Sequence, residues 1–566
     1  MNIALIDLQQ AARTLEWLAG EVINMQRQRL IHKPLDYIQF NLDGELATFP
    51  SFRNPILQQV LGRAPLSLVE LEQAFRRIGD DPRPRGVVLY LRNLTLSLAD
   101  VQTLRQSIGR LRAKGKRVVA YAQSYDLGNY LVASACDAIY LQPTGVVMTL
   151  GLLRQEIYLK DALAALGLEF DSVAISPYKS AADQLSRSEP SAEVIAQSNW
   201  LLDSWYEQIV AMLTEGRKLA PEQARVLIDG APYTDREALE QGVVDGLCHE
   251  ETLKQTLDAR QIVLWEEADG MLPLKVNASP RYVAVLNLSG AIVNGESAAP
   301  PPIDFPLPLP FVGEARIGDV TTVNILRHIL KDKDAAALVV YVDSPGGSAS
   351  ASEAIAATLS EIARTRPVVV CMGAVAASGG YYISTPADHI VAQGATVTGS
   401  IGVLLGKLVN NETLKKLRMN AVTYQRGANA AILSAQSAFS DSERARMVAN
   451  IQAIYERFVA RVADSRKMKP DAVDAIGGGR VWTGAQALGH GLVDQLGGLV
   501  EAVEQARQMA KLPADAPARL VRGRFKPLAA ELAEQLDPAA ALRYSLESLE
   551  LIANGRPALL MPSMWR

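Results

Sequence analysis

Two glycine-rich loops carry the residues best suited to chemistry, and both lie in the second half of the chain. The first is the run VVYVDSPGGSASASEAI at 339–355, which is typical of a strand, a glycine turn and a helix. Glycine lets backbone N–H groups approach a ligand closely, and a helix start adds partial positive charge. This loop therefore predicts a site for an oxyanion or a phosphate, and a plain strand–turn–helix junction is the alternative.

The second loop, CMGAVAASGGYYIS at 371–384, contains the candidate nucleophile Ser378. Small residues around Ser378 would let a substrate backbone reach its hydroxyl, and the N–H of Gly379 is suited to bind a developing oxyanion. Gly347 of the first loop precedes Ser378 by 31 residues. Successive strands of one sheet would bring the two loops together, which favours acyl-transfer chemistry over a simple turn.

A nucleophilic serine needs a general base, and histidine is the usual one. The chain has five histidines, which are His32, His249, His328, His389 and His490. His389 follows the run PAD on an expected strand and is interpreted as a core or surface residue, so a Ser-His-Asp triad finds no support. Lysine is the alternative base, and it must be kept neutral by desolvation.

The elements that must position these residues occur in two copies. Segments in the two halves match at a spacing near 250 residues, which aligns Asp137 with Asp388 and Asp245 with Asp494. This spacing is far too long for a solenoid unit, so it indicates two complete copies of one domain.

Each copy alternates strand-like apolar runs with segments of helical spacing, which predicts a mostly parallel α/β sheet covered by helices. The predicted fold class is therefore α/β with a tandem duplication. The expected divisions are a helical extension at 1–34, a first domain at 35–255, a linker at 256–280, a second domain at 281–512 and a helical tail at 513–566.

Three motifs in a fixed order resemble the signal peptide peptidase A (protease IV) group, peptidase family S49. They are DSPGG at 343–347, AASGGYYIS at 376–384 and TVTGSIGV at 396–403. The resemblance extends over most of residues 35–510 and is closest to the long tandem-repeat form of the family. It implies the fold of the ClpP/crotonase superfamily, which is built from repeated ββα units.

The resemblance also implies roles for individual residues. Lys179, in the Tyr-Lys-Ser run of the first copy, would be the general base for Ser378, which follows it by 199 residues. Gly347 and Gly379 would supply the N–H groups of an oxyanion hole. Ser400, in the run TGSIG, would hydrogen-bond Lys179 and orient it.

The two copies have lost complementary parts of this site. Ala430 of the second copy falls near the lysine position, and Leu127 of the first copy falls where Ser378 lies in the second. ClpP-like proteases place a histidine about 25 residues after the serine, where this chain has Val403. We therefore expect a working site to require both copies, brought together across an interface.

Composition excludes several other classes. The 57 basic and 61 acidic residues are interspersed, and the net charge is −4, so a nucleic-acid partner is not expected. The three cysteines lie far apart, which argues against a disulfide framework or a zinc site. No metal or cofactor is implied. By resemblance, the substrates are hydrophobic peptides such as released signal peptides, cleaved through an acyl-enzyme, and the assembly is a homotetramer.

Targeting segments are not found in the sequence. The first residues carry acidic side chains where a secretory signal would be apolar, and no run of about twenty apolar residues occurs. The expected location is cytoplasmic or peripheral to a membrane, with residues 1–30, 299–311 and 558–565 as possible membrane contacts. Two other functions stay open: a non-catalytic peptide-binding scaffold, and a crotonase-type acyl-CoA enzyme that works with carboxylates.

Overall fold

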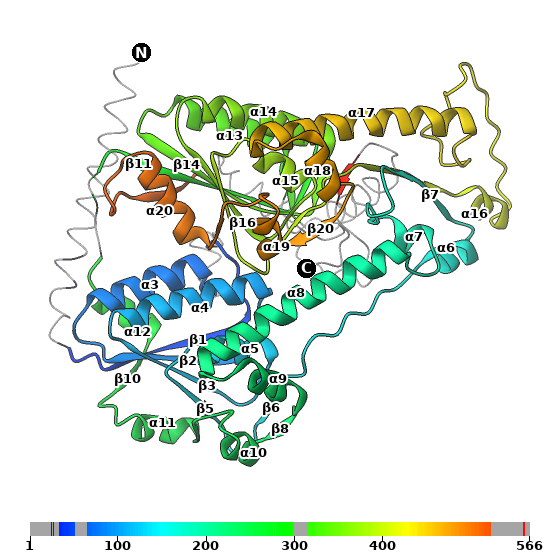
Figure 1. Ribbon diagram of the computed structural model, residues 1–566. Helices are drawn as coiled ribbons and strands as arrows, with labels where there is room; N and C mark the ends of the chain where they lie inside the picture. The colour runs from blue at the N-terminus through cyan, green and yellow to red at the C-terminus, as the bar shows by residue number, and fades with distance from the viewer. Residues whose placement is uncertain are drawn as a thin grey trace. The chain divides into compact units, whose positions relative to one another are not determined.

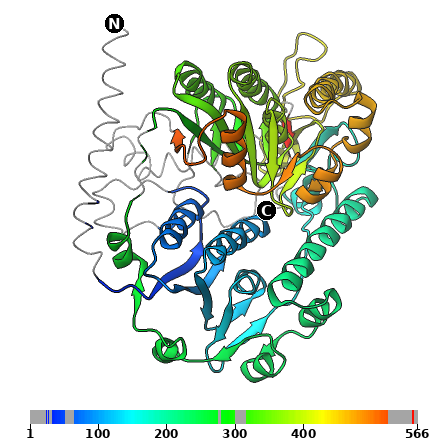
Figure 2. The ribbon, with the colours of Figure 1, turned by 60° about the vertical axis from the view of Figure 1, so that its left-hand side comes forward.

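The computed structural model describes residues 24, 27, 33–50, 65–274, 277, 279–298, 315–521 and 558–560 (Figures 1 and 2). The chain divides into two compact units. Unit 1 comprises Met1–Leu153 and Trp205–Pro280, and unit 2 comprises Arg154–Ser204 and Arg281–Arg566. The division falls within the long helix α8 (Ala192–Arg217), between Ser204 and Trp205.

Unit 1 is built on a sheet in which, among the described residues, six strands all run parallel. In sheet order these strands are β10 (Ile262–Leu264), β1 (Tyr37–Glu45), β2 (Gly86–Thr95), β3 (Arg117–Ala122), β5 (Ala138–Leu141) and β9 (Gly246–Leu247). A small second sheet contains β4 (Tyr125–Asp126), β6 (Val146–Met148) and β8 (Tyr233–Thr234). The helices of this unit are α3 (Leu68–Asp80), α4 (Leu98–Ala113), α5 (Leu127–Ala133), α9 (Pro221–Asp229), α10 (Asp235–Glu240), α11 (Glu250–Thr256), α12 (Trp265–Ala268) and η1 (Asp269–Met271).

Unit 2 repeats this plan around a larger sheet. Its path runs β20 (Val481–Thr483), β18 (Val397–Gly399), β16 (Val368–Ala377), β14 (Ala335–Ser344), β11 (Tyr282–Ser289) and β22 (Ala518–Val521), with β17 (His389–Ala392) and β21 (Gln495–Leu496) beside β16. Strands β14 and β16 are nearly continuous apolar runs with buried side chains. Such runs are typical of parallel strands covered on both faces, and Figures 1 and 2 show helices α14 (Ala349–Ala363) and α20 (Leu499–Met509) on opposite faces of this sheet.

The remaining helices of unit 2 begin at recognisable caps. Helix α17 (Asp441–Arg466) starts after Ser440, whose side chain accepts from the N–H of Glu443 in a capping box. The others are α6 (Lys160–Leu166), α7 (Asp183–Ser186), α13 (Asp319–Lys331), α15 (Gly379–Ser384), α16 (Asn411–Lys416), α18 (Pro470–Ile476) and α19 (Gly484–Gly489). Among the helices of the described ranges, none combines the length and apolarity that crossing a bilayer requires.

A second sheet of unit 2 joins segments that are remote in sequence. Its order is β13 (Arg316–Gly318), β12 (Ala291–Val293), β15 (Gly346–Ser348), β23 (Ala558–Leu560), β19 (Leu404–Val409) and β7 (Glu169–Ala174). Strand β7 pairs antiparallel with the whole of β19. This pairing explains why residues 154–204, which the repeat assigns to the first copy, belong to the second compact unit.

The duplication inferred from the sequence is confirmed by matching contacts in the two units. In each copy an aspartate accepts a backbone N–H at the start of one strand, and a second aspartate does so at the next strand. The four contacts are Asp137 with Val118 (2.8 Å), Asp388 with Val368 (2.8 Å), Asp245 with Ile139 (2.7 Å) and Asp494 with Ile390 (2.8 Å). The chain is therefore a tandem duplication of one α/β domain.

Two stretches differ from the expected organisation. The expected linker at 256–280 contains β10 and α12, because the apolar run at Ile262–Leu264 adds a parallel edge strand beside β1. The expected helical tail at 513–566 contains strands β22 and β23, since both find sheet partners in unit 2. The proline-rich stretch 299–311 and most of the extension 1–34 lie outside the described residues.

Candidate active site

Ser378 lies at a sharp turn from strand to helix. Strand β16 ends at Ala377 and helix α15 begins at Gly379, so Ser378 is the residue between them. Its φ of 54° and ψ of −112° are unusual for a residue with a side chain, which is typical of strain held by surrounding structure at functional sites. The Ser378 N–H donates to the carbonyl of Gly399 at 2.8 Å. This turn directs a serine hydroxyl from the end of a buried strand.

The two glycines expected to form the oxyanion hole are neighbours in space. A Cβ added to Gly379 would lie 3.1 Å from the Gly347 nitrogen. Gly347 has a φ of +152°, and a Cβ there would come within 2.0 Å of the Ile292 carbonyl oxygen. Only glycine fits at Gly347, because strand β12 packs directly against it. Both loops therefore meet at Ser378, as their spacing predicted.

Lys179 follows strand β7 and reaches Ser378. Its Nζ lies 2.6 Å from Ser378 Oγ, and it donates to Ser400 Oγ at 2.9 Å and to the Ser400 carbonyl at 3.0 Å. A neutral amine has two N–H donors and one lone pair. The two Ser400 oxygens use the donors, and the lone pair remains for the Ser378 hydroxyl proton.

The environment of Lys179 favours the neutral amine. Lys179 is 1 % exposed, and Ser378 and Ser400 are 0 % exposed. Burial lowers the pKa of Lys179 well below its ordinary value, because desolvation penalises the ammonium ion. The arrangement thus provides a proton acceptor next to a serine hydroxyl.

A run of three glycines, 477–479, supports Lys179 and was missed as part of the site by sequence reasoning. A Cβ on Gly479 would lie 2.6 Å from the Cα of Lys179, and Gly479 has a φ of +87°. The Gly479 N–H donates to the Ile401 carbonyl at 2.7 Å, and the Ser400 N–H donates to the Arg480 carbonyl at 2.6 Å. This run therefore joins the turn of Ser400 to the backbone of Lys179. The glycine run itself was the available signal.

Aromatic residues anchor the lysine segment to strand β20. The Arg480 guanidinium lies 4.1 Å from the centre of the Tyr178 ring, next to Lys179 in the chain. Trp200 stacks on Trp482 with ring centres 5.1 Å apart, and its indole N–H donates to the Val481 carbonyl at 2.9 Å. These pairs join positions about 280 residues apart, so no local pattern reveals them.

The structure separates His389 from Ser378. His389 pairs with Val369 near the start of β16, whereas Ser378 follows the end of that strand, about 30 Å away at ~3.3 Å per residue. Its Nε2 lies 3.1 Å from Gln495 Oε1. His389 is therefore a structural residue, as the sequence suggested.

The expectation that the site forms between the two copies differs from the structure in one respect. Lys179 and Ser378 both belong to unit 2, because residues 154–204 pack with the second half of the chain. The lysine thus comes from the first copy in sequence and from the second unit in structure.

Neither the cysteines nor the described acidic and histidine residues form a metal centre. No group of three or more His, Cys, Asp or Glu side chains within the described ranges could hold a metal ion. The three cysteines are free and buried, and burial raises the pKa of Cys136 to about 12 and that of Cys248 to about 11. These thiols are not poised to react.

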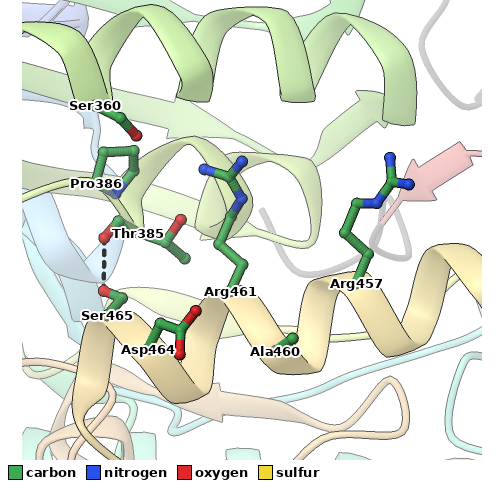
Figure 3. Close-up of a pocket in the computed structure, with 8 residues that line it drawn as sticks. All are labelled: Ser360, Thr385, Pro386, Arg457, Ala460, Arg461, Asp464 and Ser465. Atoms are coloured by element: carbon green, nitrogen blue, oxygen red, sulfur yellow. Dashed lines mark hydrogen bonds between the residues drawn. The ribbon is translucent and has the colours of Figure 1, made fainter.

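A separate pocket of about 500 Å³ lies between α14, the end of α15 and α17 (Figure 3). Arg457, Arg461 and Asp464 of α17 line it, and the Ser465 hydroxyl donates to the Thr385 carbonyl at 2.5 Å. None of its lining residues belongs to the group around Ser378.

Comparison with known proteins agrees with the fold and the site. The duplicated parallel α/β domain, with a serine between strand and helix, defines a serine peptidase of the ClpP-like class, and a Clp protease profile matches residues 318–390. The chain belongs to peptidase family S49, whose profile matches twice, at residues 110–263 and 360–513.

Several curated relatives resemble most of the chain. It is 33% identical over 470 residues to "Protease 4" of Salmonella typhi, covering 79% of this chain and 72% of the relative. It is 30% identical over 488 residues to "Serine protease SPPA, chloroplastic" of Arabidopsis thaliana, covering 83% and 70%. "Protease 4" of Haemophilus influenzae is 31% identical over 471 residues, covering 78% and 73%. The chain is therefore a serine peptidase.

Proposed function

We propose that this peptidase works through a Ser378–Lys179 dyad and cleaves hydrophobic peptides by way of an acyl-enzyme. The observation that carries the proposal is the 2.6 Å separation of Lys179 Nζ and Ser378 Oγ, with both side chains buried. Burial alone lowers the pKa of Lys179, so the amine has the protonation state that a general base needs.

In the acylation step, neutral Lys179 accepts the Ser378 proton as the hydroxyl oxygen attacks the scissile carbonyl carbon. The carbonyl oxygen becomes an oxyanion, which the N–H groups of Gly347 and Gly379 stabilise. The adjacency of these two glycines supports a shared oxyanion hole. Ser400 holds the amine by accepting its two N–H bonds, so that the lone pair faces Ser378.

Collapse of the tetrahedral intermediate then breaks the amide bond. Protonated Lys179 gives its proton to the leaving amine and returns to the neutral form. A water molecule, deprotonated by the same amine, attacks the acyl group on Ser378 and releases it. Lys179 therefore acts as base and acid in both halves of the reaction.

The substrate class is proposed from the relatives and from resemblance. One relative, 37% identical over 188 residues, is named "Putative signal peptide peptidase SppA" in Enterococcus faecium. Released signal peptides and other apolar peptides are accordingly the proposed substrates of this chain. Assembly as a homotetramer and peripheral membrane contact remain predictions from the same resemblance.

Cleavage of a fluorogenic hydrophobic peptide between pH 6 and 10 tests the dyad. We expect Ser378→Ala and Lys179→Met to lose at least about 100-fold in kcat/KM, because general-base catalysis contributes ~10²–10⁴-fold. Wild-type activity should rise with pH as the Lys179 ammonium loses its proton, and the limb should lie below the ordinary lysine range because burial lowers this pKa.

Lys407→Met is the matched control. Lys407 is another buried lysine of unit 2, but its Nζ lies over the Phe439 ring at 4.3 Å and donates to the Ile432 carbonyl. This variant should keep the pH profile of the wild type. Normal cleavage by Lys179→Met would contradict the proposed dyad.

A further inference from the structure

Strand β23 occupies a notable position in the second sheet of unit 2. It lies between β15 and β19, antiparallel to both, and appears as the short red arrow in Figure 1. Gly346, Gly347 and Ser348 pair with Leu560, Leu559 and Ala558 in that order. Leu404, at the start of β19, pairs with Ala558. A short segment near the end of the sequence therefore fills the gap between two strands.

The elements around β23 are those that build the site. Strand β15 carries Gly347, and β19 begins four residues after Ser400. Helix α15, which starts directly after Ser378, also contacts β23. The backbone of residues 558–560 thus lies where the oxyanion loop, the nucleophile turn and the lysine-orienting turn converge.

A peptide substrate of this enzyme needs the same place. Its scissile carbonyl must lie within reach of Ser378 Oγ and of the Gly347 N–H at once. An extended peptide achieves this by adding a strand to an exposed sheet edge, where main-chain hydrogen bonds fix its position. The edge of β15 is the one that carries Gly347, and β23 pairs with this edge.

Burial of the nucleophile agrees with an occupied groove. Ser378 is 0 % exposed, and Gly346 and Gly347 are buried as well. A peptide cannot reach a fully buried hydroxyl until something moves away from it. The run Ala-Leu-Leu at 558–560 is also uncharged, as the proposed substrates are.

We propose that residues 558–560 act as a built-in substrate mimic, which occupies the peptide-binding strand position and inhibits the enzyme until a peptide displaces it. This inference rests on the proposed function of the Ser378 site. A segment of the same chain competes at an effective concentration on the order of millimolar. Apparent substrate affinity falls by the fraction of molecules in which the groove is open. Substrates should bind in the direction of β23, antiparallel to β15 and β19.

Leu559→Pro in the full chain tests the inhibition. Proline removes a backbone N–H and is disfavoured inside a paired strand, so it should release residues 558–560 from β15. We expect kcat/KM for the fluorogenic hydrophobic peptide to rise about tenfold, mainly through a lower KM, as expected if about one molecule in ten is open in the wild type. Leu559→Val, which keeps the N–H and the strand preference, should match the wild type.

A second measurement does not depend on activity. Amide hydrogen exchange of residues 346–348 should be at least about tenfold faster in Ser378→Ala/Leu559→Pro than in Ser378→Ala, because the strand partner is lost. A synthetic peptide with the sequence of residues 556–562, RPALLMP, should slow this exchange again when added to the double variant.

These measurements separate the two proposals. Faster exchange together with higher kcat/KM in Leu559→Pro supports the mimic. Unchanged exchange at 346–348, or unchanged kcat/KM in an active enzyme, overturns it. If Ser378→Ala cleaves peptides as well as the wild type, the proposed dyad fails, while the exchange result still decides whether residues 558–560 occupy the groove.

Discussion

At the scale of single residues, the chemistry depends on how one buried amine is shared among three oxygen atoms. Lys179 has Ser378 Oγ, Ser400 Oγ and the Ser400 carbonyl within hydrogen-bond distance. The Ser400 carbonyl can only accept, so one N–H is committed to it. If Ser400 Oγ takes the second N–H, the lone pair can face only Ser378. Ser400 therefore decides the direction of the base as well as its pKa.

Replacing Ser400 with alanine tests this orientation. Ser400→Ala removes one hydrogen bond, worth ~1 kcal/mol, so we expect kcat to fall about tenfold. The lost acceptor also stabilised the ammonium form, so the pKa of Lys179 should fall further and the rising limb of the pH–rate profile should move to lower pH. Steady-state rates from pH 6 to 10 measure both effects, and a limb that moves to higher pH would contradict the assignment.

At the scale of elements, the positions of strand ends and tight turns hold the site together. Strands β14 and β16 end at the two glycine-rich loops, while β7 leads to Lys179 and β19 follows Ser400. The glycine run 477–479 lies between the last two turns, where the backbone approach leaves no room for a side chain. The precision of the dyad is therefore a property of packed backbone.

Gly479→Ala should disturb Lys179 without touching Ser378. A Cβ there would lie 2.6 Å from the Lys179 Cα and requires a φ of +87°, which costs about 1–3 kcal/mol. We expect the thermal midpoint of unit 2 to fall and kcat/KM to drop more than tenfold, measured by calorimetry and peptide cleavage.

Gly489→Ala is the control for this change. A Cβ at Gly489 meets nothing within 4 Å, and its φ is not in the left-handed region. Activity and midpoint should stay near those of the wild type. Equal losses in both variants would indicate general sensitivity of the unit instead of a specific role for Gly479.

At the scale of the whole molecule, the duplication repeats structure without repeating the site. Each unit contains an arginine paired with the second aspartate of its copy, Arg217 with Asp245 and Arg466 with Asp494. Both arginines are largely buried, and each also donates to a backbone carbonyl. The framework of the fold is thus kept twice, whereas Ser378, Gly347 and Lys179 come together only in unit 2.

Removing one arginine at a time should distinguish the two units. Arg466→Ala and Arg217→Ala each leave a carboxylate without its charged partner, which costs about 1–3 kcal/mol. We expect Arg466→Ala to lower the temperature at which peptidase activity is lost. Arg217→Ala should lower an unfolding transition by calorimetry and leave kcat near the wild-type value at 25 °C. A large loss of kcat in Arg217→Ala would contradict the confinement of the chemistry to unit 2.

The sequence by itself determined the duplication, the parallel α/β class and the loops at Ser378 and Gly347. These features depend on the order of apolar runs and glycines along a continuous segment, which local backbone preferences record directly. The role of Lys179 required a resemblance to a known family, because a Tyr-Lys-Ser run has no distinctive local property.

Only the tertiary structure decided which unit holds Lys179, that 477–479 supports it, and that 558–560 pairs with the oxyanion loop. Each of these contacts joins positions more than 200 residues apart in the chain. Such contacts arise from sheet pairing and close backbone packing, in which the partner's identity is set by geometry and leaves no mark on neighbouring residues.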